Sequence, residues 1–453
     1  MEPDWNLVFV VAMFATFLAL LLSGYPVAFV LAGVGVLFAA AGELANAAGI
    51  DVDADLALLG LTVDRFHGTL SSFSLVPLPL FVFMGHMLDR SGIAADLLVG
   101  LQLLLRRVSG GLALAVTLLG VILAASTGII GASVALLGTL ALPGMLDDGY
   151  QPELAVGTVA AAGCLGILIP PSIMLVLMSE PMQLSVGDLF LGAVLPGLVL
   201  ASLYLAYLLV LCAWRPELAP AAGAAARRAS RREAWVRVGK GLVPPLALVL
   251  AVLGSIFFGV VSPSEAAGVG ALGATLLAAL RRRLDLATLR EVSRATTRTT
   301  AFIFAIFLGA TCFAVVLRGL GGDEVIAGAI TALPFGPTGV VLALMALVFV
   351  LGFFLDWIEI TLIVLPLVEP VTATLGIDKL WFTVLVAVCL QTSFLTPPVG
   401  FALFYLKGVA PPSIDLGHLY RGIVPFVALQ LLGLALIFTF PALVTWLPAA
   451  AWN

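Results

Sequence analysis

Two acidic residues, Asp356 and Glu359, stand inside the apolar stretch LGFFLDWIEITLIVLPL. They are three positions apart, so on a helix they share one face. A charged side chain at membrane depth is costly and by default marks an ion or substrate path. We therefore predict that this pair serves an ion or a substrate.

Two apolar stretches, LGILIPPSIMLVLM at 165–178 and TSFLTPPVGFALF at 392–404, each hold a Pro-Pro pair. Proline inside a helix removes a backbone N–H and clashes with the preceding turn, at a cost of about 3 kcal/mol. In lipid, the freed carbonyl groups are tolerated where they line a cavity or meet a ligand. Carbonyl and hydroxyl oxygens suit Na⁺, and half-helix N-termini suit a carboxylate. The pattern predicts two polar pockets near the membrane midplane; the alternative is two proline kinks that serve packing alone.

The residues around these breaks, and around the tip ASTGIIGAS at 125–133, are the candidate ligands. The tip offers hydroxyl groups and turn-forming glycines. The predicted ion-binding residues are Thr127, Gly128, Ser133, Gly163, Pro170, Asp356, Thr396, Pro397 and Gly400. The predicted substrate-binding residues are Ser126, Ser172, Glu359, Gln391 and Thr392.

Composition places these motifs in a membrane. Of the 453 residues, 62% are hydrophobic and 10% are charged, and the mean hydropathy is +1.19. Soluble domains have roughly 45–50% apolar and about 25% charged residues. No basic patch with interleaved aromatics indicates nucleic acid. The dispersed histidines and cysteines predict no transition-metal site, and we interpret the cysteines as packed small hydrophobes: Cys164, Cys212, Cys312 and Cys389.

The apolar segments that we interpret as membrane elements are 6–22, 26–41, 73–88, 111–142, 152–179, 188–212, 242–261, 264–280, 301–318, 338–367, 380–409 and 420–447. The first has no cleavage site after it and is predicted to be a span, not a signal peptide. Two segments, 111–142 and 338–367, are too long for one span and are predicted to be re-entrant hairpins. The remaining segments give ten crossings.

Basic residues orient these crossings. All Lys and Arg residues except Arg65, Arg318 and Lys379 fall in the loops 89–110, 213–241, 281–300 and 407–421. Positively charged loops stay in the cytoplasm. This predicts that both termini are periplasmic and that 43–60 is an external loop.

The two halves of the chain resemble each other. The motif AGVG occurs at 32–35 and at 267–270, and a glycine precedes each Pro-Pro pair by 21 residues, Gly149 before Pro170 and Gly376 before Pro397. Five crossings in each half form an odd number, so the second half must start on the opposite side of the membrane. We predict an all-α membrane protein with two inverted-topology repeats of the kind that alternating-access transporters use. The first repeat is 1–212, with hairpin 111–142 and broken helix 152–179. A basic cytoplasmic linker covers 213–241, and the second repeat is 242–453, with hairpin 338–367 and broken helix 380–409.

The stretches GILIPPSIMLVLM, LPGMLDDGYQPELAVGTVAAAG, VGDLFLGAVLPG, FFLDWIEITLIVLPL and LTPPVGFALFYLKGVAP resemble the large membrane subunit of tripartite ATP-independent periplasmic (TRAP) transporters, the DctM type. The resemblance implies a Na⁺-coupled, elevator-type importer in the bacterial inner membrane. It also implies a small four-span membrane subunit of the DctQ type and a periplasmic substrate-binding protein of the DctP type as partners.

The same resemblance assigns residues. The family's acidic residue of the second hairpin matches Asp356, and a family arginine near the substrate path matches Arg318, which adds Arg318 to the predicted substrate-binding residues. In the first tip, Ile129 and Ile130 replace two family serines, so backbone carbonyls must supply more of the coordination there. The tip and FFLDWIEI are more similar to the branch associated with 2-oxo acids and with mannitol or chloroaromatic compounds than to the sialic-acid branch.

Other functional classes fit less well. A proton-coupled transporter of the same topology stays open, with Asp356 and Glu359 as proton carriers. An anion channel needs a continuous polar pore, whereas this chain predicts two closed pockets. An intramembrane acid protease would have no use for repeated helix breaks, and a structural subunit would not need buried carboxylates. We therefore expect a non-enzymatic importer of a small organic anion, a carboxylate such as a 2-oxo acid.

Overall fold

Apolar segments form helices here because a chain in lipid must satisfy its backbone hydrogen bonds within each segment. The computed structural model describes residues 4–127, 130–221, 231–331 and 334–451, with the backbone alone at 124–127, 231, 233 and 331. These described residues contain helices and no strand. The prediction of an all-α chain is confirmed.

The helices of the first half are α1 (Trp5–Leu21), α2 (Val27–Ala47), α3 (Leu58–Leu70), η1 (Phe73–Leu75), α4 (Pro77–Arg90), α5 (Ile93–Leu105), α6 (Gly111–Thr127), α7 (Ile130–Asp147), α8 (Pro152–Cys164), η2 (Leu165–Ile167), α9 (Ile173–Met182), α10 (Val186–Trp214) and η3 (Pro216–Leu218). Those of the second half are α12 (Arg231–Phe257), α13 (Pro263–Leu280), α14 (Leu286–Gly319), α15 (Gly322–Thr331), α16 (Pro337–Leu351), α17 (Trp357–Thr374), α18 (Lys379–Leu395), α19 (Phe401–Val409), α20 (Leu416–Thr439) and α21 (Ala442–Ala451).

Eight helices of the described chain are long and apolar enough to cross a membrane, or nine if the bent pair α3 and η1–α4 forms one span. They include α7 and α17, the second arms of the two predicted hairpins, and leave out the broken helices. Both predicted hairpins consist of two helices, α6–α7 and α16–α17. Both predicted broken helices are divided in two, α8 from α9 and α18 from α19.

Several segments predicted as loops are helical. The external loop 43–60 is shortened at both ends, because α2 runs to Ala47 and α3 begins at Leu58. The cytoplasmic loop 89–110 contains α5, and the last span 420–447 consists of α20 and α21. Helix α5 escapes a hydropathy scan because it has 13 residues, so a window of about 19 residues averages it with its polar flanks.

The basic linker 213–241 is also shorter than predicted, because α12 begins at Arg231. The basic loop 281–300 is largely the first part of α14, which begins at Leu286. The Asp285 carboxylate caps this helix by accepting a hydrogen bond from the Thr288 N–H, with Oδ1 2.6 Å from the nitrogen. This bond lowers the pKa of Asp285.

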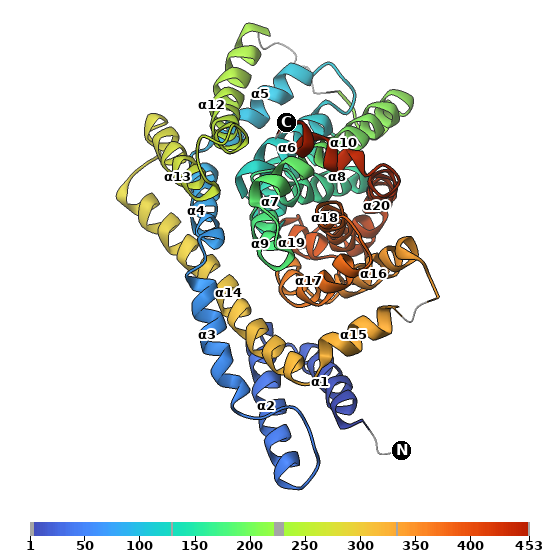
Figure 1. The fold of residues 1–453 in the computed structure, drawn as a ribbon. Coiled ribbons are helices and arrows are strands. Elements are labelled where there is room, and N and C mark those ends of the chain that lie inside the picture. The colour runs from blue at the N-terminus through green and yellow to red at the C-terminus, as the bar shows by residue number, and fades with distance from the viewer. Residues whose placement is uncertain (1–3, 128–129, 222–230, 332–333, 452–453) are drawn as a thin grey trace.

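The helices form two groups (Figure 1). One group contains α6–α10 and α16–α21, with α8 against α20, α7 against α8 and α16 against α18. The other is an elongated row in which α14 packs against α2, α3 and α4, and α13 packs against α4 and α12. Contacts of α4 with α6 and α9, and of α14 with α17, join the two groups.

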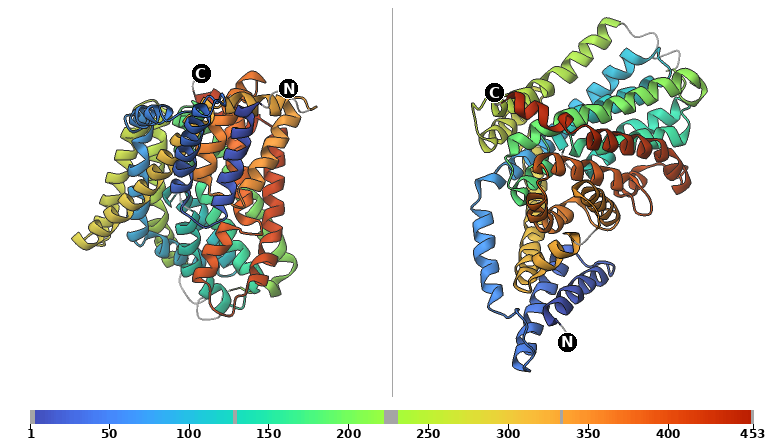
Figure 2. Two further views of the ribbon diagram at one scale, coloured as in Figure 1. Left: turned by 90° about the horizontal axis from the view of Figure 1, so that it is seen from below. Right: turned by 45° about the vertical axis from the view of Figure 1, so that its right-hand side comes forward.

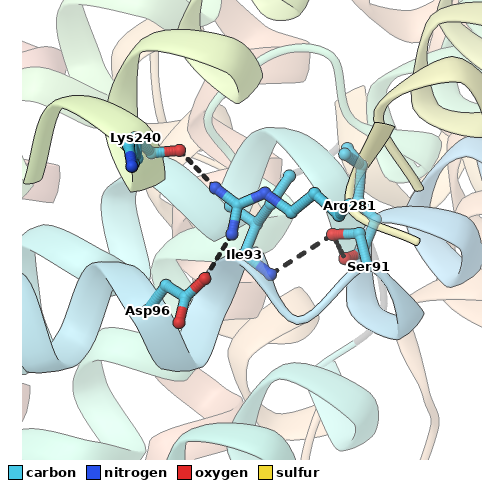
Figure 3. A network of polar contacts seen from close by, with 6 residues as sticks. Ser91, Ile93, Asp96, Lys240 and Arg281 are labelled. Atoms are coloured by element: carbon cyan, nitrogen blue, oxygen red, sulfur yellow. Dashed lines mark hydrogen bonds and ion pairs between the residues drawn. The ribbon is translucent and has the colours of Figure 1, made fainter. Parts of the chain in front are cut away.

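One end of the row is held by polar contacts (Figure 3). The Arg281 guanidinium pairs with the Asp96 carboxylate of α5 and donates to the Lys240 carbonyl of α12. Arg281 follows α13, so a single side chain connects three helices. The start of α1 and the end of α21 lie at the same end of the molecule (Figure 2, left), as an even number of crossings would require.

Candidate functional site: two helix breaks and two polar crevices

The acidic pair forms the start of α17. Asp356 is the N-cap residue, and its Oδ1 accepts a hydrogen bond from the Trp357 N–H at 2.8 Å. The Asp356 side chain also accepts from the Glu359 backbone, while the Glu359 carboxylate accepts from the Asp356 N–H. This reciprocal arrangement is a capping box, which satisfies backbone donors at a helix start.

The capping box gives both carboxylates a structural role, and their spacing in the sequence is enough to predict it. An acidic residue followed three positions later by Glu, before an apolar run, is a sign of a helix start. From the same spacing we predicted only that the two charges share one face. The box leaves carboxylate lone pairs over, so capping does not remove the capacity of Asp356 to meet a cation.

The end of α18 carries the polar residues predicted beside this hairpin. The hydroxyl groups of Thr392, Ser393 and Thr396 donate to carbonyls of their own helix, at 2.9, 2.8 and 2.8 Å. Their oxygen lone pairs remain acceptors. Gln391 is fully buried, and its amide has no hydrogen-bond partner among the described residues.

The second break separates α18 from α19. It contains the Pro397–Pro398 cis peptide, and Gly400 has φ +54°. The tip of the second hairpin lies against this region, because a Cβ added at Gly352 would be 2.1 Å from the Ser393 Oγ. The second hairpin therefore contacts α18 at Ser393, three residues before Thr396 and the break.

The first break separates α8 from α9, with the turn η2 between them. It contains the Pro170–Pro171 cis peptide, and the buried Ser172 hydroxyl donates to the Ile167 carbonyl. Gly163 lies against α7, since an added Cβ would be 2.4 Å from Val134 Cγ2. The first hairpin and the first break are thus in contact.

The tip of the first hairpin is only partly described. Gly128, and the side chains of Ser126 and Thr127, lie outside the described residues. Ser133 lies on α7 and is buried.

Each hairpin also contacts the broken helix of the other half of the chain. Helix α7 packs against α19, and α17 packs against α9. Tyr405 of α19 lies at the contact with α7. A Cβ added at Gly131 would be 2.8 Å from the Tyr405 ring, and Tyr405 is within electrostatic range of Asp356 and Glu359. Tyr405 is not among the residues predicted from the sequence; its one signal there is a phenol soon after a predicted helix break.

One polar cavity, of about 310 Å³, lies between α3, α14, α17 and the end of α9. It is lined by Arg65, Arg318, Thr311 and Glu180, and by Leu362 and Pro366 of α17. Leu362 and Pro366 follow Glu359 by three and seven positions, so all three share a helix face. Arg318 also pairs with Asp323, with 3.1 Å between Nε and Oδ2. The structure thus places Arg318 with Arg65 along the face of α17 that carries Glu359.

A second polar cavity, of about 390 Å³, lies between α4, α7 and α14. Its lining includes His86, Asp89 and Thr139, and the Arg90–Glu291 ion pair. The buried His86 Nε2 and Asp89 Oδ1 have no hydrogen-bond partner among the described residues. The α7 residues of this cavity are again one helix face: Ala132, Ala135, Leu136 and Thr139. This crevice was not predicted from the sequence.

These features define a multi-pass membrane protein in which each hairpin contacts a broken helix and the second arm of each hairpin lines a polar crevice. Residues 14–443 match the family described as the tripartite ATP-independent periplasmic transporter, DctM component. The chain belongs to this family, which confirms the resemblance found in the sequence.

Named relatives agree. The chain is 30% identical, over 385 residues, to the C4-dicarboxylate TRAP transporter large permease protein DctM of Pseudomonas aeruginosa, covering 85% of this chain and 88% of the relative. It is 29% identical to the sialic acid TRAP transporter large permease protein SiaM of Vibrio cholerae, covering 95% and 96%. Both relatives are named as transporter permeases, which points to a role in transport and not in catalysis.

A solved structure has the same kind of fold. The Alcanivorax borkumensis YdaH transporter matches with a TM-score of 0.60 at 17% identity, covering 85% of this chain and 88% of that one. At this identity the similarity concerns the fold alone.

Proposed function

We propose that this protein is the large permease subunit of a Na⁺-coupled, binding-protein-dependent importer of a small organic anion. The observation that carries the proposal is the cavity lined by Arg65 and Arg318, which runs along the face of α17 that carries Glu359. A guanidinium matches a carboxylate in shape and charge. Two of them beside the hairpin and break suit a carboxylate substrate such as a 2-oxo acid.

Na⁺ coupling is supported by the oxygen atoms at the second break. Hydroxyl oxygens of Thr392 and Thr396, carbonyls released at Pro397 and Pro398, and the Asp356 carboxylate are hard ligands of the kind that Na⁺ takes from unwound helices. A Na⁺ ion held there would offset part of the burial cost of the carboxylate. At the first break, the Ser172 oxygen and the backbone near Gly163 and Pro170 would supply the corresponding ligands.

Alternating access would follow from the position of α14. Its residues Ala295 and Thr311 line different crevices and lie about 24 Å apart along the helix axis. Each crevice is closed on its other side by the second arm of one hairpin, α7 or α17. We propose that the hairpins and broken helices move as a unit against the row containing α14, in an elevator-type cycle.

Inverted repeats would give this unit its symmetry. The crossed packing of α7 on α19 and α17 on α9 supports two equivalent halves, 1–212 and 242–453. We further propose that the protein lies in the bacterial inner membrane with both termini periplasmic. A small four-span membrane subunit and a periplasmic substrate-binding protein would complete the transporter.

Uptake by reconstituted vesicles tests the proposal. Proteoliposomes should accumulate a carboxylate only with the small subunit, a substrate-loaded binding protein and an inward Na⁺ gradient. Equal uptake with K⁺ replacing Na⁺ on both sides would refute Na⁺ coupling. Uptake without the binding protein, at a rate proportional to substrate concentration, would indicate an anion channel.

Proton coupling is the second candidate. His86 and Asp89 of the second crevice, whose Nε2 and Oδ1 atoms are buried without hydrogen-bond partners among the described residues, are titratable groups that could carry a proton. Uptake driven by a proton gradient in Na⁺-free buffer would favour it. Loss of that uptake in His86→Gln or Asp89→Asn, with Na⁺-driven uptake unaffected, would assign the proton to this crevice.

A further inference from the structure

The outer face of α14 carries a stripe of basic and hydroxyl side chains. Arg290, Ser293, Arg294, Thr297 and Arg298 are spaced by three or four residues, so they form one continuous row on the helix. All five are exposed. We call this row the arginine stripe.

The stripe is exposed because the other side of the helix is used for packing. Val292, Ile303 and Ile306 are at most 2% exposed, on the side where α14 meets α2 and α4. The first part of α14, which carries the stripe, projects from the side of the molecule (Figure 2, left). The stripe therefore faces whatever surrounds the protein.

The described residues do not neutralise the charge of the stripe. Within the described chain, no acidic side chain pairs with Arg290, Arg294 or Arg298. The nearby Glu291 pairs instead with Arg90. Arg281, by contrast, is committed to Asp96 and Lys240. Three free guanidinium groups with hydroxyls between them form a surface suited to phosphate oxygens.

The same helix face becomes apolar directly after the stripe. Ala301, Ala305 and Leu308 continue the row at helical spacing and are all exposed, Leu308 by 41%. A cationic segment next to an apolar track fits a molecule with an anionic phosphate head and a hydrocarbon tail. A free phosphate would use the arginines alone and leave the track uncovered.

We propose that the arginine stripe and the following apolar track form a binding site for an anionic phospholipid. The head-group phosphate lies among Arg290, Arg294 and Arg298, and an acyl chain lies along Ala301, Ala305 and Leu308. The site is separate from the crevices and does not depend on the proposed function. It would anchor the end of α14 at the membrane surface while other helices move.

The test measures binding of dioleoyl-phosphatidylglycerol and dioleoyl-phosphatidylcholine to the purified full-length chain in detergent, by native mass spectrometry. We expect phosphatidylglycerol to bind more tightly. The triple variant Arg290→Gln/Arg294→Gln/Arg298→Gln should lose about tenfold or more in apparent affinity. If the triple variant fails to fold, Arg294→Gln alone should lose part of the affinity for phosphatidylglycerol. Replacement of all three arginines by Lys should keep most of that affinity.

A matched control removes the same charge elsewhere. Arg107→Gln/Arg282→Gln/Arg283→Gln changes three exposed arginines that are not on the stripe and should lose less than about threefold, because the contact is short-range. Equal losses in both triple variants, or equal binding of the two lipids, would overturn the proposal.

Two further measurements identify the ligand. Ala305→Trp should weaken binding of phosphatidylglycerol, and glycerophosphoglycerol, which has no acyl chains, should compete poorly. Equally strong competition by glycerophosphoglycerol would make this a free-anion site and refute the lipid. If the triple variant also lost its small subunit on purification, and that subunit displaced lipid from the wild type, the stripe would be a protein interface.

Discussion

Asp356 has two separable properties, its shape as a helix cap and its charge. Its side chain accepts hydrogen bonds from the start of α17, and the Glu359 carboxylate accepts one from the Asp356 N–H. Asn is as good an N-cap as Asp, whereas Ala is a poor one. Substitutions can therefore distinguish stabilisation of the hairpin from a role in ion binding.

We predict that Asp356→Ala lowers the free energy of unfolding by about 1 kcal/mol, while Asp356→Asn leaves it nearly unchanged. If the charge meets Na⁺, Asp356→Asn should raise the Na⁺ concentration for half-maximal uptake severalfold, or abolish uptake. Thermal unfolding and Na⁺-dependent uptake at matched expression measure the two effects. Wild-type Na⁺ dependence in the Asn variant would show that Asp356 caps the helix and does not bind Na⁺.

Gln391 is the clearest sign of a functional polar residue in the interior. A buried amide without a partner costs about 1–3 kcal/mol, and Gln391 lies beside the second break. We predict that Gln391→Leu keeps or raises thermal stability but lowers uptake at least tenfold.

The matched control for Gln391 is Gln430→Leu on α20. Gln430 is also fully buried, and its amide lies next to the Tyr204 hydroxyl, whereas Gln391 has no such neighbour among the described residues. Uptake should stay within about twofold of wild type in this variant, since α20 carries none of the break residues. Equal loss of uptake in both variants would mean that removal of any buried amide is harmful.

At the scale of elements, glycines set how closely α8 can approach α20. A Cβ added at Gly157 would be 2.1 Å from the Gly422 carbonyl oxygen. A Cβ added at Gly422 would be 2.2 Å from the Glu153 backbone carbonyl oxygen. Backbone atoms cannot move aside as a flexible side chain can. Small residues that allow such close approach are typical of helix packing in membranes.

We predict that Gly157→Ala destabilises the protein by about 1–3 kcal/mol through overpacking. Gly254→Ala on α12 is the control, because no atom lies within 4 Å of its added Cβ. That change should be neutral or stabilising by up to about 1 kcal/mol. Thermal unfolding in detergent would show the difference, and an unchanged midpoint for Gly157→Ala would mean that α8 and α20 are less tightly packed.

At the scale of the whole molecule, the proposed transport cycle requires the two helix groups to move relative to each other. Ala135 of α7 and Ala295 of α14 line the same crevice from the two groups. We predict that Ala135→Cys/Ala295→Cys, joined by a bifunctional maleimide, abolishes uptake. The native cysteines are all buried and should react little.

The control for this cross-link lies within one group. Arg90→Cys/Glu291→Cys joins α4 to α14 at a natural ion pair and should cross-link with uptake largely retained. The comparison is uptake per cross-linked molecule. Full uptake by the α7–α14 cross-linked protein would exclude sliding of α7 past α14.

The sequence by itself determined the helical class, the membrane location and the family, because these depend on local hydropathy and on contiguous motifs. It also located both breaks, since proline disrupts a helix wherever it stands. Local patterns could have revealed the capping box of Asp356 and Glu359 as well, since it needs only four consecutive residues.

Only the tertiary structure decided which elements meet. The pairing of α7 with α19 and of α17 with α9 joins residues from opposite halves of the chain. Arg65 and Arg318 share a cavity although they are distant in sequence, and His86 and Asp89 face α7 across another. Helix formation is satisfied within each segment, whereas packing between helices depends on side-chain fit along several faces at once. The spacing of residues within one segment therefore does not predict which other helix it packs against.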